Sequence, residues 1–94
     1  MAMTRTQAEL LAAQVLDWLA GDPARIGAFM AACGTDPAAL RAQAGTPEML
    51  LAVLDFLLSD EAMLLACCAD LGIAPTAPAM AQAALPGGAQ YHWT

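Results

Sequence analysis

A short segment that occurs twice is the feature of the sequence that most restricts its fold. Residues 15–22 read VLDWLAGD and residues 53–60 read VLDFLLSD, an offset of 38 positions. Aligned at this offset without a gap, residues 15–37 and 53–75 share 10 identities in 23 positions, where such a composition gives about 3 by chance. The pattern predicts a tandem duplication of one structural unit.

Both copies carry an apolar stripe at helical spacing. The positions i, i+4, i+7 and i+8 are held by Leu11, Val15, Trp18 and Leu19 in the first copy and by Met49, Val53, Phe56 and Leu57 in the second. Alanine and leucine supply most of the 60% hydrophobic residues, and a chain poor in β-branched and aromatic residues favours helices over strands. We therefore predict an all-α fold in which two units of three helices bury each other's apolar faces.

Helix start and stop signals divide each unit into short helices. Side-chain oxygens of the preferred N-cap types, each followed by a helical pattern, are supplied by Thr6, Asp22, Asp36, Thr46 and Asp60. Thr6 and Glu9 have the spacing of a capping box, and Gly21 is suited to a left-handed helix end. Gly34, Gly45 and Gly72 mark the ends of later helices. These signals predict a compact bundle of five or six helices, the first over about residues 6–20 and the last between about 74 and 84.

The length of the chain fits one domain, since 94 residues lie within the usual range of a single core. We expect a helical domain over residues 1–88, with repeat units over about 6–45 and 46–86, and a C-terminal tail over 89–94. Tyr91, His92 and Trp93 lie in that tail. Two interpretations remain open for it: an aromatic segment that docks into a groove, or a frayed terminus.

The second copy is more apolar than the first, because alanines on the far side of the first helix are replaced by leucines 38 positions later. A helix that is apolar on every side is either the centre of a bundle or half of an interface. The candidate interface residues are Leu50, Leu51, Leu58, Met63 and Leu65, with Trp93 as a further anchor.

The charge of the chain argues against two classes of partner. A net charge of -6, with three arginines and no lysine, is a poor match for nucleic acid or an anionic membrane surface. The apolar runs at 49–54 and 62–69 are far shorter than the ~18 residues of a membrane span. Glu9 and Asp17 interrupt the apolar N-terminal stretch, which a secretory signal needs unbroken. We expect a cytoplasmic protein.

Four residues have side chains that could bind a metal, but another role explains each of them better. They are Cys33, Cys67, Cys68 and His92. Cys67 and Cys68 are adjacent, which does not match the spacing of zinc ligands, and at the offset of 38 they align with Phe29 and Met30. The alignment favours small core residues for them and for Cys33. His92 belongs to the tail, so we expect no metal and no cofactor.

Two aspartates occupy equivalent positions in the repeat, in the last turn of each long helix. Asp17 and Asp55 lie where the helix dipole disfavours a carboxylate, so we expect a structural hydrogen bond for each, to Arg25, Arg41 or a helix-start amide. Neither has a second acid or a histidine nearby in the pattern, and phosphate-binding or nucleophile motifs do not occur. No catalytic residue is predicted, and we expect a protein that is not an enzyme.

Three segments resemble a known family. They are DPARIG at residues 22–27, TDPAALR at 35–41 and VLDFLL at 53–58, and the resemblance extends to about Gly88. The family consists of short bacterial proteins catalogued only as a domain of unknown function. The resemblance implies an all-helical cytoplasmic protein, and it supplies no activity and no functional residues.

Two functional hypotheses follow from the sequence. The first is a non-enzymatic protein-interaction or self-associating module, whose partner is another protein or a second copy in a homodimer. It depends on the surplus apolar surface of the second unit. The alternative is a carrier of a small apolar ligand held between the two helical units.

Overall fold

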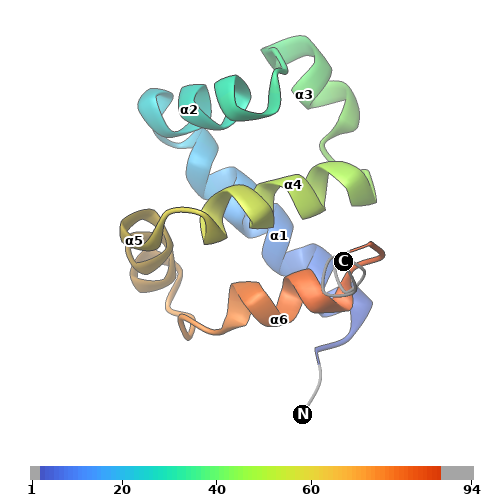
Figure 1. The fold of residues 1–94 in the computed structure, drawn as a ribbon, viewed down its shortest axis with the longest axis vertical. Helices are drawn as coiled ribbons and strands as arrows, with labels where there is room; N and C mark the ends of the chain where they lie inside the picture. The colour runs from blue at the N-terminus through green and yellow to red at the C-terminus, as the bar shows by residue number, and fades with distance from the viewer. Residues whose placement is uncertain (1–2, 88–94) are drawn as a thin grey trace.

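The computed structural model describes residues 3–87, which form six α-helices and no strand (Figure 1). The helices are α1 (Arg5–Ala20), α2 (Pro23–Cys33), α3 (Pro37–Gln43), α4 (Pro47–Leu58), α5 (Glu61–Leu71) and α6 (Ala77–Ala84). The predicted all-α bundle is confirmed. No helix in this part of the chain has the length and apolar character needed to cross a bilayer.

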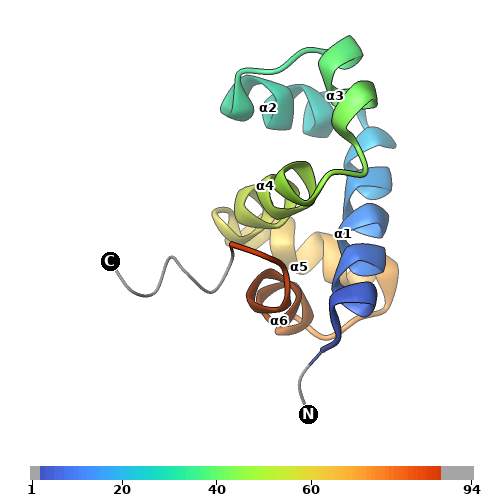
Figure 2. The same ribbon diagram turned by 90° about the vertical axis from the view of Figure 1, so that its right-hand side faces the viewer.

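The central element of the bundle is α4. It packs against α1, α2, α5 and α6, and the most extensive contacts in the molecule join α1 to α6 and to α4. Figure 2 shows α1 along one side of the molecule, with α4 and α6 beside it. Helix α3 has the fewest contacts of the six and lies next to α2 at one end of the bundle (Figures 1 and 2).

The core is built around the apolar surface of α4. Its buried side chains are Met49, Leu50, Leu51, Val53, Leu54 and Leu57, which cover most of the helix circumference. The facing side chains of α1 are Ala8, Leu11, Ala12, Val15 and Leu19, and α6 and its end contribute Pro78, Ala81 and Leu85. Small alanines in α1 and α6 allow these helices to approach closely.

Four of the five predicted N-caps are confirmed. In each, the side chain accepts a hydrogen bond from a backbone N–H of the first turn. The donors are Ala24 for Asp22 at 2.8 Å, Ala39 for Asp36 at 2.9 Å, Met49 for Thr46 at 3.2 Å and Met63 for Asp60 at 3.1 Å. These bonds satisfy amides that the helix itself leaves free.

The fifth predicted cap, Thr6, is wrong. Helix α1 begins two residues earlier, and Thr4 caps it in a reciprocal box with Gln7. Both threonines fit the same sequence pattern, but only the earlier start places Met3 before the cap, where it packs against the core as an apolar staple. Glu9 pairs instead with Arg5 at 3.2 Å.

The ends of α2 and α5 have the same backbone geometry. Gly34 and Gly72 are left-handed, with φ of 66° and 68°, and the next residue donates to the carbonyl of Met30 or Cys68 at 3.0 Å in each case. These positions are 38 residues apart. The left-handed end predicted at Gly21 is wrong, because this residue continues the right-handed turn of α1 with a φ of -71°. The third helices differ, because α6 packs along α1 and α4, whereas α3 has far fewer contacts and Leu40 is its buried side chain. The three-helix repeat stays a prediction.

The sixth helix, predicted from about residue 74, begins at Ala77 instead. Residues 75 and 76 form a turn before it, and Pro78 occupies its first turn, where a missing N–H costs nothing. The predicted tail over 89–94 lies outside the described residues.

Exchange of either threonine for alanine tests the start of α1. We expect Thr4→Ala to lower the free energy of unfolding by about 1 kcal/mol, because it removes an N-cap oxygen. Thr6→Ala is the matched control and should cause no loss, since this side chain is exposed inside the first turn. Urea denaturation of both variants is the measurement. Equal losses, or a larger loss for Thr6→Ala, would contradict the assigned cap.

Candidate functional site

The predicted interface residues are mostly inside the molecule. Leu50 and Leu51 are only 4% and 8% exposed, because neighbouring helices cover α4, so their assignment to a surface is wrong. Leu58 and Met63 are half-buried, and Met63 packs against the core. Leu65 on α5 is 48% exposed.

Trp93, the remaining interface candidate, lies outside the described residues. The sequence left two explanations for the apolar surface of the second unit, an interface or the centre of the bundle. For α4, the structure supports the centre of the bundle.

Two exposed apolar residues were missed by the sequence analysis. Leu10 on α1 is 62% exposed and Met80 on α6 is 41% exposed. The buried face of α6 is formed by Pro78, Ala81 and Leu85, and a helical projection of these positions would have placed Met80 on the opposite side.

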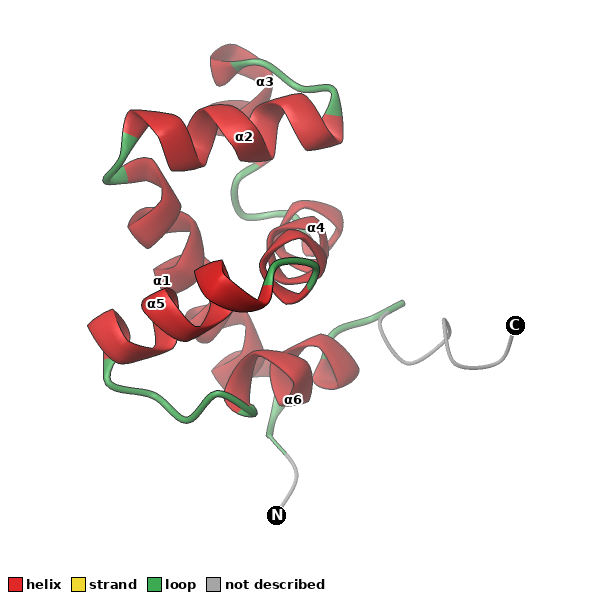
Figure 3. Ribbon diagram, turned by 60° about the vertical axis from the view of Figure 1, so that its left-hand side comes forward, coloured by secondary structure: helices red, strands yellow, loops and turns green. Residues whose placement is uncertain are grey.

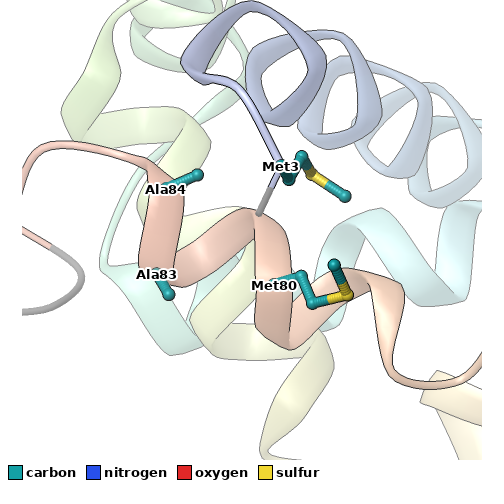
Figure 4. Close-up of a pocket in the computed structure, with 4 residues that line it drawn as sticks. All are labelled: Met3, Met80, Ala83 and Ala84. Atoms are coloured by element: carbon teal, nitrogen blue, oxygen red, sulfur yellow. The ribbon is translucent and has the colours of Figure 1, made fainter. Parts of the chain in front are cut away.

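An apolar surface hollow lies beside Met80. It has a volume of about 210 Å³ and is lined by Met3, Met80, Ala83 and Ala84; we call it the Met80 hollow. Figure 4 shows Met3 reaching it from the segment before α1, while the other three residues come from α6. All four side chains are apolar, and the two methionines can adapt their shape because their thioether chains are flexible and polarisable.

A second hollow has a mixed lining. It has a volume of about 420 Å³ and lies between the end of α2, α3 and the start of α4; we call it the Glu48 hollow. It is lined by Cys33, Gly34, Thr35, Ala39, Gln43, Glu48, Met49 and Ala52. The hollow exists because α3 packs less closely on its neighbours than α6 does.

The cysteines are confirmed as core residues in two of three cases. Cys67 and Cys68 are buried, and Cys33 is exposed at the last residue of α2, so the core prediction for Cys33 is wrong. Burial, and then the neighbouring Cys68 and Asp70, raise the pKa of Cys67 to about 11, against a smaller opposing effect of Arg25. Burial also raises the pKa of Cys68. Both thiols are protonated at neutral pH.

No cluster of three or more potential metal ligands occurs within residues 3–87. The fourth residue of the rejected metal site, His92, lies outside this range.

A cluster of three side chains joins α1, α2 and α5. Trp18 Nε1 donates a hydrogen bond to Asp70 Oδ2 at 2.7 Å, and the Arg25 guanidinium lies over the Trp18 ring, 3.8 Å from its centroid. The ring therefore contacts a cation on its face and a carboxylate at its N–H. Figure 3 shows α5 beside α1 on this side of the molecule. The cluster of Trp18, Arg25 and Asp70 holds these three helices together.

The predicted structural hydrogen bond is confirmed for Asp55. Its carboxylate accepts from Gln82 Nε2, which ties the end of α4 to α6. The donor is thus neither an arginine nor a helix-start amide. Asp17 is exposed and forms no such bond with a described residue. The position 38 residues before Gln82 is Ala44, which has no side-chain donor.

Over residues 3–87, the fold is a small all-α bundle of six helices, and its surface includes the apolar Met80 hollow and the mixed Glu48 hollow. The chain belongs to the family described as protein of unknown function, DUF3572, which it matches over residues 5–88. The resemblance seen in the sequence to a family of unknown function is confirmed. Neither a curated protein nor a solved structure matches the chain.

The raised pKa of Cys67 predicts a loss of stability at alkaline pH. The unfolded thiol ionises near its ordinary pKa of 9.0, whereas the folded thiol keeps its proton up to about 11. The stabilisation is complete below pH 9 and disappears as the pH rises through 11, a change of up to about 2–3 kcal/mol. We expect the unfolding free energies of wild type and Cys67→Ala, measured in urea, to converge over this range. A difference that does not change with pH would contradict the assignment.

Proposed function

We propose that the protein is a non-enzymatic interaction module that binds an apolar side chain of a partner protein in the Met80 hollow. The observation that supports this is the apolar lining of the hollow beside an exposed methionine. Its volume of about 210 Å³ is below the ~300–1,000 Å³ of small-molecule pockets. One large apolar side chain is a better match in size.

The floor of the hollow is held in place by packing. Helix α6 is anchored through buried Pro78, Ala81 and Leu85 and through the bond from Gln82 to Asp55. Met3 packs against the core from the other side. Because the recess is formed before binding, little conformational entropy is lost when a partner side chain enters it. The flexible methionine side chains can adapt to the shape of that side chain.

The charge of the chain favours a different protein over a second copy as the partner. Two molecules with a net charge of -6 each repel one another on approach, whereas a neutral or basic partner does not meet this barrier. A homodimer is the less favoured form of the same proposal. The three free cysteines suit a reducing compartment, so we place this function in the cytoplasm.

The ligand-carrier alternative has weaker support. The Glu48 hollow lies between the two predicted units, and its volume of about 420 Å³ suits a small molecule. Thr35, Gln43 and Glu48 line it, however, and an apolar ligand would remove these polar groups from water without replacing their hydrogen bonds.

A charge placed at Met80 tests the proposal. We expect Met80→Asp to reduce recovery of the bound partner by tenfold or more in affinity capture from host lysate with quantitative mass spectrometry, because a central apolar contact is replaced by a carboxylate. Leu10→Asp is the matched control, being an exposed helical position outside the hollow. Circular dichroism checks that both variants are folded.

Three results would count against this function. They are the same bound proteins for wild type and both variants, no protein retained by any of them, or equal losses at the two positions. Sedimentation of the wild type over a range of concentrations identifies a homodimer, which Met80→Asp should dissociate.

A further inference from the structure

The Glu48 hollow combines an apolar floor with a polar rim. Met49 is buried and Ala52 half-buried, while Gln43 and Glu48 are exposed at the edge. A side chain that contacts both surfaces must be apolar along its length and polar at its end. Lysine and arginine have this form, because their aliphatic stems pack on apolar surface while the charged group stays at the rim.

The charges around the hollow determine whether it favours a positively or a negatively charged side chain. Glu48 contributes a carboxylate to the lining. The pKa of Cys33, also in the lining, is raised by partial burial and then by the negative charge of Asp55, so a second carboxylate acts on the same wall. Both carboxylates that act on this wall are negative, which favours a cation over an anion as the occupant.

None of the described arginines forms an ion pair with Glu48. Arg5 pairs with Glu9 at 3.2 Å and Arg25 with Asp22 at 3.8 Å. Arg41 is exposed on α3 and forms no ion pair within residues 3–87. Within residues 3–87, an incoming cation would therefore not have to displace an arginine.

The chain's own packing explains why the hollow is open. Gln43 on α3 is 38 positions before Ala81 on α6, and Ala81 is fully buried in the core. A small alanine lets α6 approach its neighbours closely. The longer, polar Gln43 remains exposed, and the less extensive packing of α3 leaves the hollow open.

We propose that the Glu48 hollow binds an arginine or lysine side chain of a partner protein, with the stem on Met49 and Ala52 and the charged group at Glu48. The inference extends the proposed function by giving the partner a basic residue, and it rests on that function only for the source of the side chain. The binding itself is a property of the hollow and can be tested alone.

The experiment is a titration of the full-length, ¹⁵N-labelled chain with N-acetyl-arginine methylamide, followed by amide chemical shifts. N-acetyl-citrulline methylamide has nearly the same shape without the charge and is the control probe. We expect saturable shifts at Thr35, Gln43 and Glu48 with the arginine probe and much smaller ones with the citrulline probe. Added salt should weaken the binding by screening the charges.

Two matched variants test the role of the carboxylate. Glu48→Gln should weaken binding of the arginine probe by about twofold to fivefold, the range of an exposed ion pair. Glu61→Gln changes the same charge in the first turn of α5 and should have no effect. The proposal is overturned if the two probes cause equal responses or if the two variants have equal effects. It is also overturned if the amide chemical shifts change near every carboxylate of the chain instead of around the Glu48 hollow.

One further variant separates this inference from the proposed function. Met80→Asp should leave the arginine titration unchanged, because Met80 does not line the Glu48 hollow. If the Met80 hollow is not an interface, the affinity capture fails while the arginine titration can still succeed. If the Glu48 hollow does not bind a cation, the titration fails whatever the affinity capture shows.

Discussion

Helix α4 is buried on nearly all sides by the helices around it. Val53, Leu54 and Leu57 are completely buried, and four other helices cover the helix that carries them. At ~25 cal/mol per Å² of apolar surface removed from water, such a helix is a major source of the hydrophobic free energy of a domain this small. The positions of α1, α2, α5 and α6 follow from the requirement to cover it.

Much of the local structure was readable from the sequence. Asp22, Asp36, Thr46 and Asp60 begin helices as predicted, because an N-cap depends on a side chain and amides within three residues. The start of α1 was placed wrongly since two threonines offered the same pattern. The earlier start places Met3 against the core, a tertiary contact that local sequence patterns do not reveal.

The surface was much harder to predict. The apolar character of Leu50 and Leu51 is equally compatible with an interface and with a central helix, and only the placement of the surrounding helices distinguishes the two. The Met80 hollow joins residues from opposite ends of the chain, and the Glu48 hollow depends on how far α3 stands from α4. Both are consequences of tertiary structure.

The two hollows differ in chemistry, and both arise where helices meet incompletely. Well-packed α6 presents methionine and alanine side chains, whereas the less closely packed α3 leaves a recess with a carboxylate at its edge. The contact of Trp18 with Arg25 and Asp70 fixes α1, α2 and α5 on another part of the molecule. The partner that we propose would present an apolar side chain to the Met80 hollow and a basic side chain to the Glu48 hollow.

Helix α4 forms the buried core of a single molecule. The most direct test is the change in unfolding free energy, measured in urea, for Leu54→Ala and for Leu65→Ala, which remove the same atoms from a buried and an exposed site. We predict a loss of about 2–5 kcal/mol for Leu54→Ala and less than about 1 kcal/mol for Leu65→Ala. Similar losses for the two variants, or a loss at Leu54 that depends on protein concentration, would contradict this account.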